Sequence, residues 1–186
     1  MSNAMIRNAR VIAAIACASA LATTAATAAL ASASEGKAAA RATSSALPRC
    51  LESGLSAGLH GRQALVANRG FILTLTNTSN TECVLDGYPG LGIEDAAHHV
   101  LPSHTHWGST YFNSDPGPKQ IVLSPGETAS ADFAFATGAG SQATYLEVTP
   151  PNAFRHLTIK IPGAPVQIVG GRLFATAMAR HTPYNT

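Results

Sequence analysis

Short runs of alternating apolar and polar residues, each closed by a turn, are the feature that most limits what this chain can fold into. In the clearest run, "FILTLT", Phe71, Leu73 and Leu75 occupy every second position. A period of two is typical of a half-buried strand. The same reasoning predicts strands at 71–76, 83–85, 91–93, 120–123, 129–135, 145–149, 157–161, 166–168 and 172–177, with a weaker candidate at 110–112.

Turn residues separate these runs, and no amphipathic helix of useful length lies between them. The stretch Ser124-Pro125-Gly126-Glu127, for example, has proline second and glycine third, as a type II turn prefers. Eight or nine short strands spaced in this way predict an all-β fold, an antiparallel immunoglobulin-like β-sandwich. A closed barrel is the alternative.

The N-terminal part of the chain has the composition of an export signal. Four residues precede a second methionine, Met5, and we interpret them as an expression scar. Arg7 and Arg10 then lead into a long uncharged run that ends in small residues at Ala33, the pattern of a secretory signal peptide. An uncleaved membrane anchor is one alternative, and a lipid-modified Cys17 is another.

The polar composition after Ala33 and at the C-terminus indicates segments without a packed core. We therefore expect an expression scar at 1–4, a signal peptide at 5–33, a flexible leader at 34–48, a β-sandwich domain at 49–179 and a disordered tail at 180–186. The formal net charge is only +2, and no basic cluster occurs, so nucleic acid is not expected as a partner. Contact with a membrane is expected only through the signal peptide or an uncleaved anchor.

Two cysteines remain once the signal peptide is removed, Cys50 and Cys83. An exported domain with two cysteines most simply pairs them, and the sequence predicts one disulfide. Two free thiols or a metal pair are the alternatives, but no CxxC spacing supports a zinc site. A disulfide would agree with a location outside the cytoplasm, either secreted or in the cell envelope.

Three motifs follow Cys50 along the chain: "LTLTNTSNTECVLDGYPGL", "VLSPGETASADFAF" and "LEVTPP". In this order they resemble a family of exported actinobacterial domains known only as a domain of unknown function, DUF4232. The resemblance runs from Cys50 to about residue 177. It implies secretion, often as a lipoprotein or an envelope-anchored protein, and a β-sandwich. It implies no reaction and no catalytic residues.

The loop "DAAHHVLPSHTHW" is the best candidate for chemistry because it holds His98, His99, His104 and His106. Neutral imidazoles at close spacing can bind Zn²⁺, Cu²⁺ or Ni²⁺, and Asp95 could add an oxygen ligand. His104 and His106 point the same way if the segment is extended. The alternative is a solvated loop without a ligand, because polar residues gather in loops for no functional reason.

Three aromatic residues, Trp107, Tyr111 and Phe112, follow the histidines. Exposed loop aromatics of a secreted sandwich can stack on sugar rings or anchor a protein partner. They can equally cap one end of the core, so the sequence leaves both interpretations open, a binding surface and a part of the core.

Sequence motifs of enzymes are missing from the chain. It has no GxSxG elbow, no HExxH and no glycine-rich phosphate loop after a strand. We therefore expect a non-enzymatic exported module without a cofactor, which binds an unknown envelope or extracellular ligand or protein. An extracellular metal-binding protein that uses the loop 95–107 is the alternative. A hydrolase with two facing carboxylates is a third and weaker hypothesis.

Overall fold

The structure is a computed structural model that describes residues 46–180. The expression scar, the signal peptide, most of the leader and all but the first residue of the tail lie outside these residues. The described part holds a 3₁₀ turn at Glu52–Gly54 and no α-helix. No helix among residues 46–180 is long and apolar enough to cross a membrane.

Eleven strands make up the described part of the chain. They are β1 (Leu55–Leu65), β2 (Asn68–Asn77), β3 (Cys83–Asp86), β4 (Gly90–Glu94), β5 (Val100–Leu101), β6 (His104–Trp107), β7 (Gln120–Leu123), β8 (Thr128–Ala143), β9 (Tyr145–Thr149), β10 (Leu157–Lys160) and β11 (Val166–Ala175).

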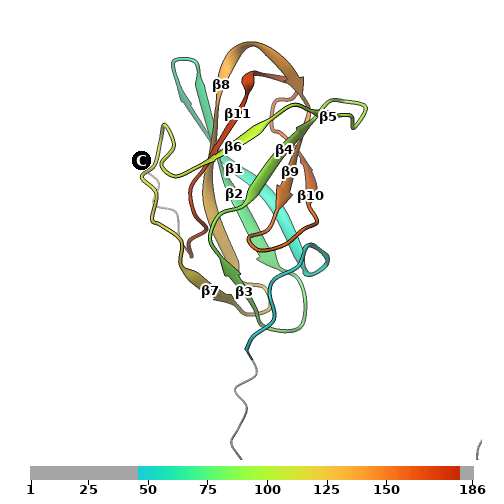
Figure 1. The fold of residues 1–186 in the computed structure, drawn as a ribbon, viewed down its shortest axis with the longest axis vertical. Coiled ribbons are helices and arrows are strands. Elements are labelled where there is room, and N and C mark those ends of the chain that lie inside the picture. Colours follow the sequence, from blue (N-terminus) through green and yellow to red (C-terminus); the bar gives the residue numbers. More distant parts are fainter. Residues whose placement is uncertain (1–45, 181–186) are drawn as a thin grey trace, which may run out of the picture. The chain divides into compact units, whose positions relative to one another are not determined.

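The strands form three sheets (Figure 1). A five-stranded sheet has the order β1-β2-β8-β11-β6, a four-stranded sheet the order β10-β9-β4-β5, and β3 pairs with β7 alone. All pairs are antiparallel except β11 with β6, which run parallel. The predicted all-β class with antiparallel sheets is confirmed, whereas the finer immunoglobulin-like assignment stays a prediction.

The hydrophobic core joins the inner faces of the sheets. Alternation along β2 and β8 buries Leu73 and Phe133 in the five-stranded sheet, and alternation along β4 and β9 buries Ile93 and Leu146 in the four-stranded sheet. Phe71 stacks on Phe133 with the ring centroids 6.4 Å apart. Since side chains alternate along a strand, the residues between these apolar ones face away from this cluster, and on β8 one of them, Asp132, is buried as well.

The disulfide prediction is confirmed, because Cys50 and Cys83 are bonded and both are buried. Backbone hydrogen bonds on either side secure the same junction. The amide of Cys50 donates to the carbonyl of Val84 at 3.0 Å, and the amide of Val84 donates to the carbonyl of Pro48 at 2.8 Å. The disulfide therefore ties the N-terminal edge of the domain to β3.

The predicted number of eight or nine strands is too low, mainly because β1, the short β5 and β6 were not predicted. The segment of β1, "LSAGLHGRQAL", has little apolar alternation, and its residues are mostly exposed. It forms a strand because it pairs antiparallel with β2 at both ends, on either side of a register shift between His60 and Gln63. β6 lies inside the predicted loop and is held by its parallel pairing with β11.

Two other boundaries differ from the prediction. Residues 110–112 are not a strand. The predicted strands at 166–168 and 172–177 belong to one strand, β11, whose register shifts between Ile168 and Leu173. Gly170 and Gly171, with φ of 60° and 62°, supply the left-handed backbone that this irregularity needs.

Candidate functional site

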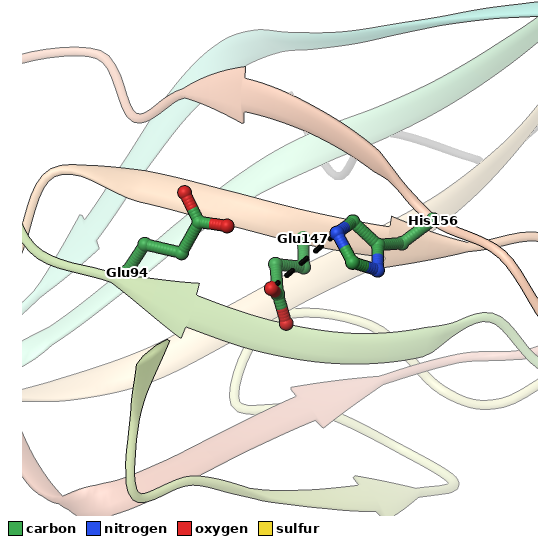
Figure 2. Close-up of side chains that lie close together, drawn as sticks. All are labelled: Glu94, Glu147 and His156. Atoms are coloured by element: carbon green, nitrogen blue, oxygen red, sulfur yellow. Dashed lines mark ion pairs between the residues drawn. The ribbon is translucent and has the colours of Figure 1, made fainter. Parts of the chain in front are cut away.

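The outer face of the four-stranded sheet carries two carboxylates. In the β4–β9 ladder, Gly92 is opposite Glu147 and Glu94 is opposite Tyr145. Because side chains alternate along a strand, Glu94 and Glu147 lie on the face away from the core, on neighbouring strands (Figure 2). Glu94 is nevertheless only 6% exposed.

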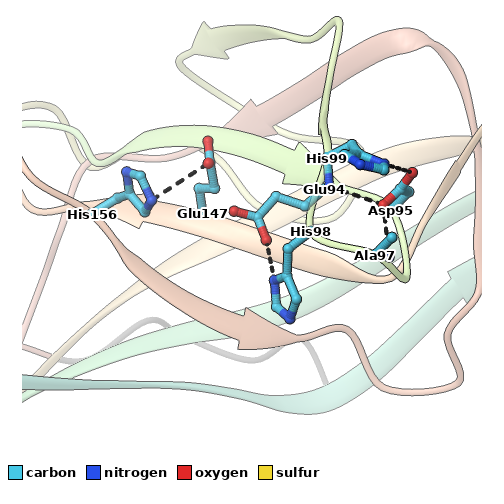
Figure 3. A network of polar contacts seen from close by, with 7 residues as sticks. All are labelled: Glu94, Asp95, Ala97, His98, His99, Glu147 and His156. Carbon is cyan, nitrogen blue, oxygen red and sulfur yellow. Dashed lines mark hydrogen bonds and ion pairs between the residues drawn. The ribbon is translucent and has the colours of Figure 1, made fainter.

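A histidine lies at each end of this carboxylate pair. His156, immediately before β10, has its Nε2 3.4 Å from Oε1 of Glu147. His98, in the turn after β4, has its Nδ1 2.6 Å from Oε2 of Glu94. The imidazole of His98 also stacks on Tyr145, with the ring centroids 4.0 Å apart. Figure 3 shows the resulting row of His98, Glu94, Glu147 and His156.

Three members of this row can offer donor atoms to one ion. One ligand atom each from Glu94, Glu147 and His156 lies within 4.8 Å of the others. Carboxylate oxygen and imidazole nitrogen are the ligands of many Zn²⁺ sites, and three protein ligands leave a fourth position for water or another group. We define these three residues as the Glu94–Glu147–His156 cluster.

The electrostatics of the cluster disfavour the ionised form of Glu147. Burial raises the pKa of Glu147, and its hydrogen-bond contact and charge repulsion with Glu94 raise it further, against the smaller opposing effect of His156. Within residues 46–180, histidine is the only basic partner of either carboxylate. A positive ion between the two neighbouring carboxylates would offset this effect on Glu147.

Gly92 leaves the space that the Glu147 carboxylate occupies. A Cβ built on Gly92 would lie 2.2 Å from Oε2 and 3.3 Å from Cδ of Glu147. Any residue with a Cβ at position 92 would therefore displace the Glu147 carboxylate from this position. The cluster thus depends on a backbone position as well as on its donor residues.

The four predicted histidine ligands are divided between two places. His98 contacts Glu94, as described above. His99 lies nearby with its Nδ1 3.1 Å from Oδ2 of Asp95, whose Oδ1 accepts the backbone amides of Ala97 and His99. These hydrogen bonds from backbone amides, the one from His99 most of all, lower the pKa of Asp95.

The other two histidines belong to β6. His104 is opposite Arg172 and His106 is opposite Phe174 in the parallel ladder, and the ring of His106 stacks on Phe174 at 5.1 Å. None of the four predicted histidines belongs to the close donor cluster found among residues 46–180. Whether they bind metal stays a prediction.

Sequence reasoning missed all three members of the cluster. Glu94, Glu147 and His156 come from separate segments, and no local motif links them. One signal was available: in "YLEVT", Glu147 lies between two residues that point into the core, so it had to face outward beside a neighbouring strand.

The three predicted binding aromatics have different surroundings. Trp107 is 62% exposed, and its Nε1 donates a hydrogen bond to the carbonyl of Pro89 at 3.0 Å. Tyr111 is partly exposed and packs edge-on against Phe174. Phe112 lies over Gly70, where a Cβ would come within 2.6 Å of its ring. Trp107 is therefore the most exposed of the three.

A family model described as a domain of unknown function (DUF4232) matches residues 50–179. The chain belongs to this family. The matched DUF4232 region begins at the disulfide cysteine Cys50 and includes the Glu94–Glu147–His156 cluster and Trp107. No curated protein and no solved structure matches the chain. The predicted family membership is confirmed, and the actinobacterial origin stays a prediction.

Proposed function

We propose that this DUF4232 domain is an exported, non-enzymatic binding module, and that its best-defined site takes a divalent transition-metal ion, with Zn²⁺ the closest fit. One observation carries the metal assignment: three donor side chains from separate segments bring their ligand atoms within 4.8 Å of one another. Export agrees with the N-terminal sequence pattern and with the buried Cys50–Cys83 disulfide, which suits an oxidising compartment.

A dication resolves the electrostatic conflict of the cluster. Two carboxylates in contact cannot both be ionised without cost, and neither has a lysine or arginine partner within residues 46–180. A Zn²⁺ ion attracts both carboxylates. Carboxylate oxygens and imidazole nitrogens bind Zn²⁺ at about 2 Å, so small side-chain movements would complete the site.

His98 has a supporting part in this proposal. Its hydrogen bond to Oε2 of Glu94 orients the carboxylate, as residues around a metal ion commonly do for its ligands. Of the four histidines in the loop, only His98 has a part in this proposed site. His104 and His106, on β6, serve as controls for nonspecific metal binding by imidazole.

The non-enzymatic part of the proposal is supported by the position of the carboxylates. A glycosidase needs two carboxyl groups on opposite sides of a bound sugar. Glu94 is 6% exposed and touches Glu147, which leaves no room for a sugar between them. A pocket of about 650 Å³ is lined by residues such as Asp95, Tyr145 and Lys160 and by neither glutamate.

Calorimetric titration of the metal-free protein with Zn²⁺ tests the metal assignment. We expect one site per chain, with the affinity reduced on the order of 10–100-fold or more by Glu147→Gln or His156→Ala, and little changed by the double control His104→Ala/His106→Ala. Binding that the Glu147→Gln variant keeps, or the absence of binding heat, would reject the site. Loss of Zn²⁺ binding in His104→Ala/His106→Ala alone, with binding kept in Glu147→Gln and His156→Ala, would instead support a metal site in the histidine loop 95–107.

A further inference from the structure

Trp107 is exposed, yet its side chain is held by a hydrogen bond and by a ring contact. Its Nε1–H donates to the carbonyl of Pro89 at 3.0 Å, and its ring stacks on Tyr88 with centroids 5.7 Å apart and planes 19° apart. Since Tyr88 backs one side of the indole and 62% of the residue is exposed, a broad aromatic surface faces solvent.

The residue that backs the tryptophan is fixed in turn. The hydroxyl of Tyr88 donates to Oδ2 of Asp115 at 2.5 Å, and Oδ1 of Asp115 accepts the backbone amide of Ala177 at 2.8 Å. The aromatic surface is therefore fastened to the C-terminal end of the domain through Asp115. A ligand that stacks on Trp107 would lose little free energy to the ordering of side chains.

A pocket of about 440 Å³ lies against this surface. Its lining includes the aromatic pair Tyr88 and Trp107 and the polar residues Asp86, Thr149 and Asn152. The side-chain amide of Asn152 donates to the carbonyl of Asp86 at 3.1 Å, and Arg49 donates to the carbonyl of Asn152 at 2.7 Å. These bonds hold the two turns that form the polar side of the pocket.

The carboxylate of Asp86 is the decisive polar group. Asp86 is exposed, and its side chain has no hydrogen bond or ion pair with any residue of the described range 46–180. A free carboxylate can accept two hydroxyl hydrogen bonds at once. An aromatic face beside a free carboxylate matches a sugar ring, which presents one apolar C–H face and several hydroxyl donors at its edge.

We propose that this pocket, which we call the Trp107 pocket, binds a neutral hexose unit of a glycan by stacking on Trp107 and by hydroxyl hydrogen bonds to Asp86. The negative charge of Asp86 disfavours uronic acids and other anionic sugars. This binding goes beyond the proposed metal site and does not depend on it.

The sequence offers a direct probe, because Trp107 is the single tryptophan of the chain. Tryptophan fluorescence, excited at wavelengths where tyrosine does not absorb, therefore reports on this pocket alone. The titrants are the neutral hexasaccharides of β-1,4-glucose, α-1,4-glucose, β-1,3-glucose and β-1,4-mannose, with hexagalacturonate as the anionic comparison and tetramethylammonium chloride as the cationic one. We expect a saturable spectral change with at least one neutral hexasaccharide and none with the other two probes.

Variants give the second part of the test, with calorimetry as the readout because Trp107→Ala removes the fluorophore. Trp107→Ala should weaken binding on the order of 30-fold, and Asp86→Asn roughly tenfold or more. Both residues are exposed, so both variants should fold, and Asp86→Asn keeps the fluorophore. The matched control is Phe154→Ala, which removes another aromatic residue, 93% exposed, outside this pocket.

Four results would overturn the proposal. They are no response to any of the neutral hexasaccharides, equal affinity for hexagalacturonate, a saturable response to tetramethylammonium, or an equal loss of binding in Phe154→Ala. The Glu147→Gln variant, which removes the proposed metal site, should keep sugar binding unchanged. The sugar and metal proposals can therefore fail separately.

Discussion

Replacing Gly92 with alanine would test whether the carboxylate cluster depends on the space at this glycine. The new Cβ would lie 2.2 Å from Oε2, 3.3 Å from Cδ and 3.4 Å from Cβ of Glu147. Gly92 is not among the glycines with positive φ, so alanine fits its backbone. The side chain of Glu147 must therefore change its rotamer, while β4 can stay in place.

The expected effect on stability is small because two contributions oppose each other. Leaving a preferred side-chain position costs about 0.5–1.5 kcal/mol. Replacing glycine with alanine at a compatible position stabilises by about 0.4–1 kcal/mol through the unfolded chain. We expect a net change in unfolding free energy within about 1 kcal/mol, and a fall in Zn²⁺ affinity on the order of 10–100-fold.

Urea denaturation and Zn²⁺ calorimetry on the same preparations measure the two quantities. Gly90→Ala is the matched control: it lies on the same strand and face, and its new Cβ would meet Cβ of Thr149 at 3.2 Å instead of Glu147. The control should keep the Zn²⁺ affinity. Unchanged Zn²⁺ affinity in folded Gly92→Ala, or a stability loss well above about 2 kcal/mol, would refute the reasoning.

Three further predictions concern stability. Replacing both Cys50 and Cys83 with alanine should lower the unfolding free energy by about 3–4 kcal/mol, measured by urea denaturation; an unchanged midpoint would contradict the disulfide's role. Phe133→Ala should cost about 3–5 kcal/mol in the same assay, because Phe133 is fully buried and stacks on Phe71; a loss below about 1 kcal/mol would mean that this core is loosely packed. Burial raises the pKa of Asp132, so its contribution to stability is complete below the unfolded pKa of about 4 and is lost as the pH rises through the folded pKa. The melting temperature of Asp132→Asn should therefore increase relative to that of the unaltered protein as the pH rises. The same pH dependence of the melting temperature in both proteins would count against a buried ionisable Asp132.

Local sequence patterns were sufficient to predict the strands in which apolar and polar residues alternate clearly. Phe71, Leu73 and Leu75 are buried as the period of two predicted. The turn at Pro125-Gly126 was also predictable, because φ of Gly126 is +81° and the amide of Glu127 donates to the carbonyl of Ser124. In both cases, the residues that specify the conformation are neighbours in the sequence.

Strands held by their partners were not predictable. β1 has a mostly exposed, weakly alternating sequence and exists because β2 offers it an edge. β6 contains two histidines and lies within a predicted loop, yet β11 provides a parallel ladder for it. Pairing with a distant strand supplies the hydrogen bonds that these segments lack on their own.

The sequence by itself determined the all-β class, the disulfide between Cys50 and Cys83, the main core strands and the family. Each of these depends on local periodicity, turn chemistry or residue type, which are properties of neighbouring residues. Only the tertiary structure decided which polar groups meet. It separated His98 from His104 and His106, brought Glu94, Glu147 and His156 together, and placed Asp86 beside Trp107. Which polar side chains come into contact depends on strand register across the sheet, because a shift of one residue turns every side chain to the opposite face.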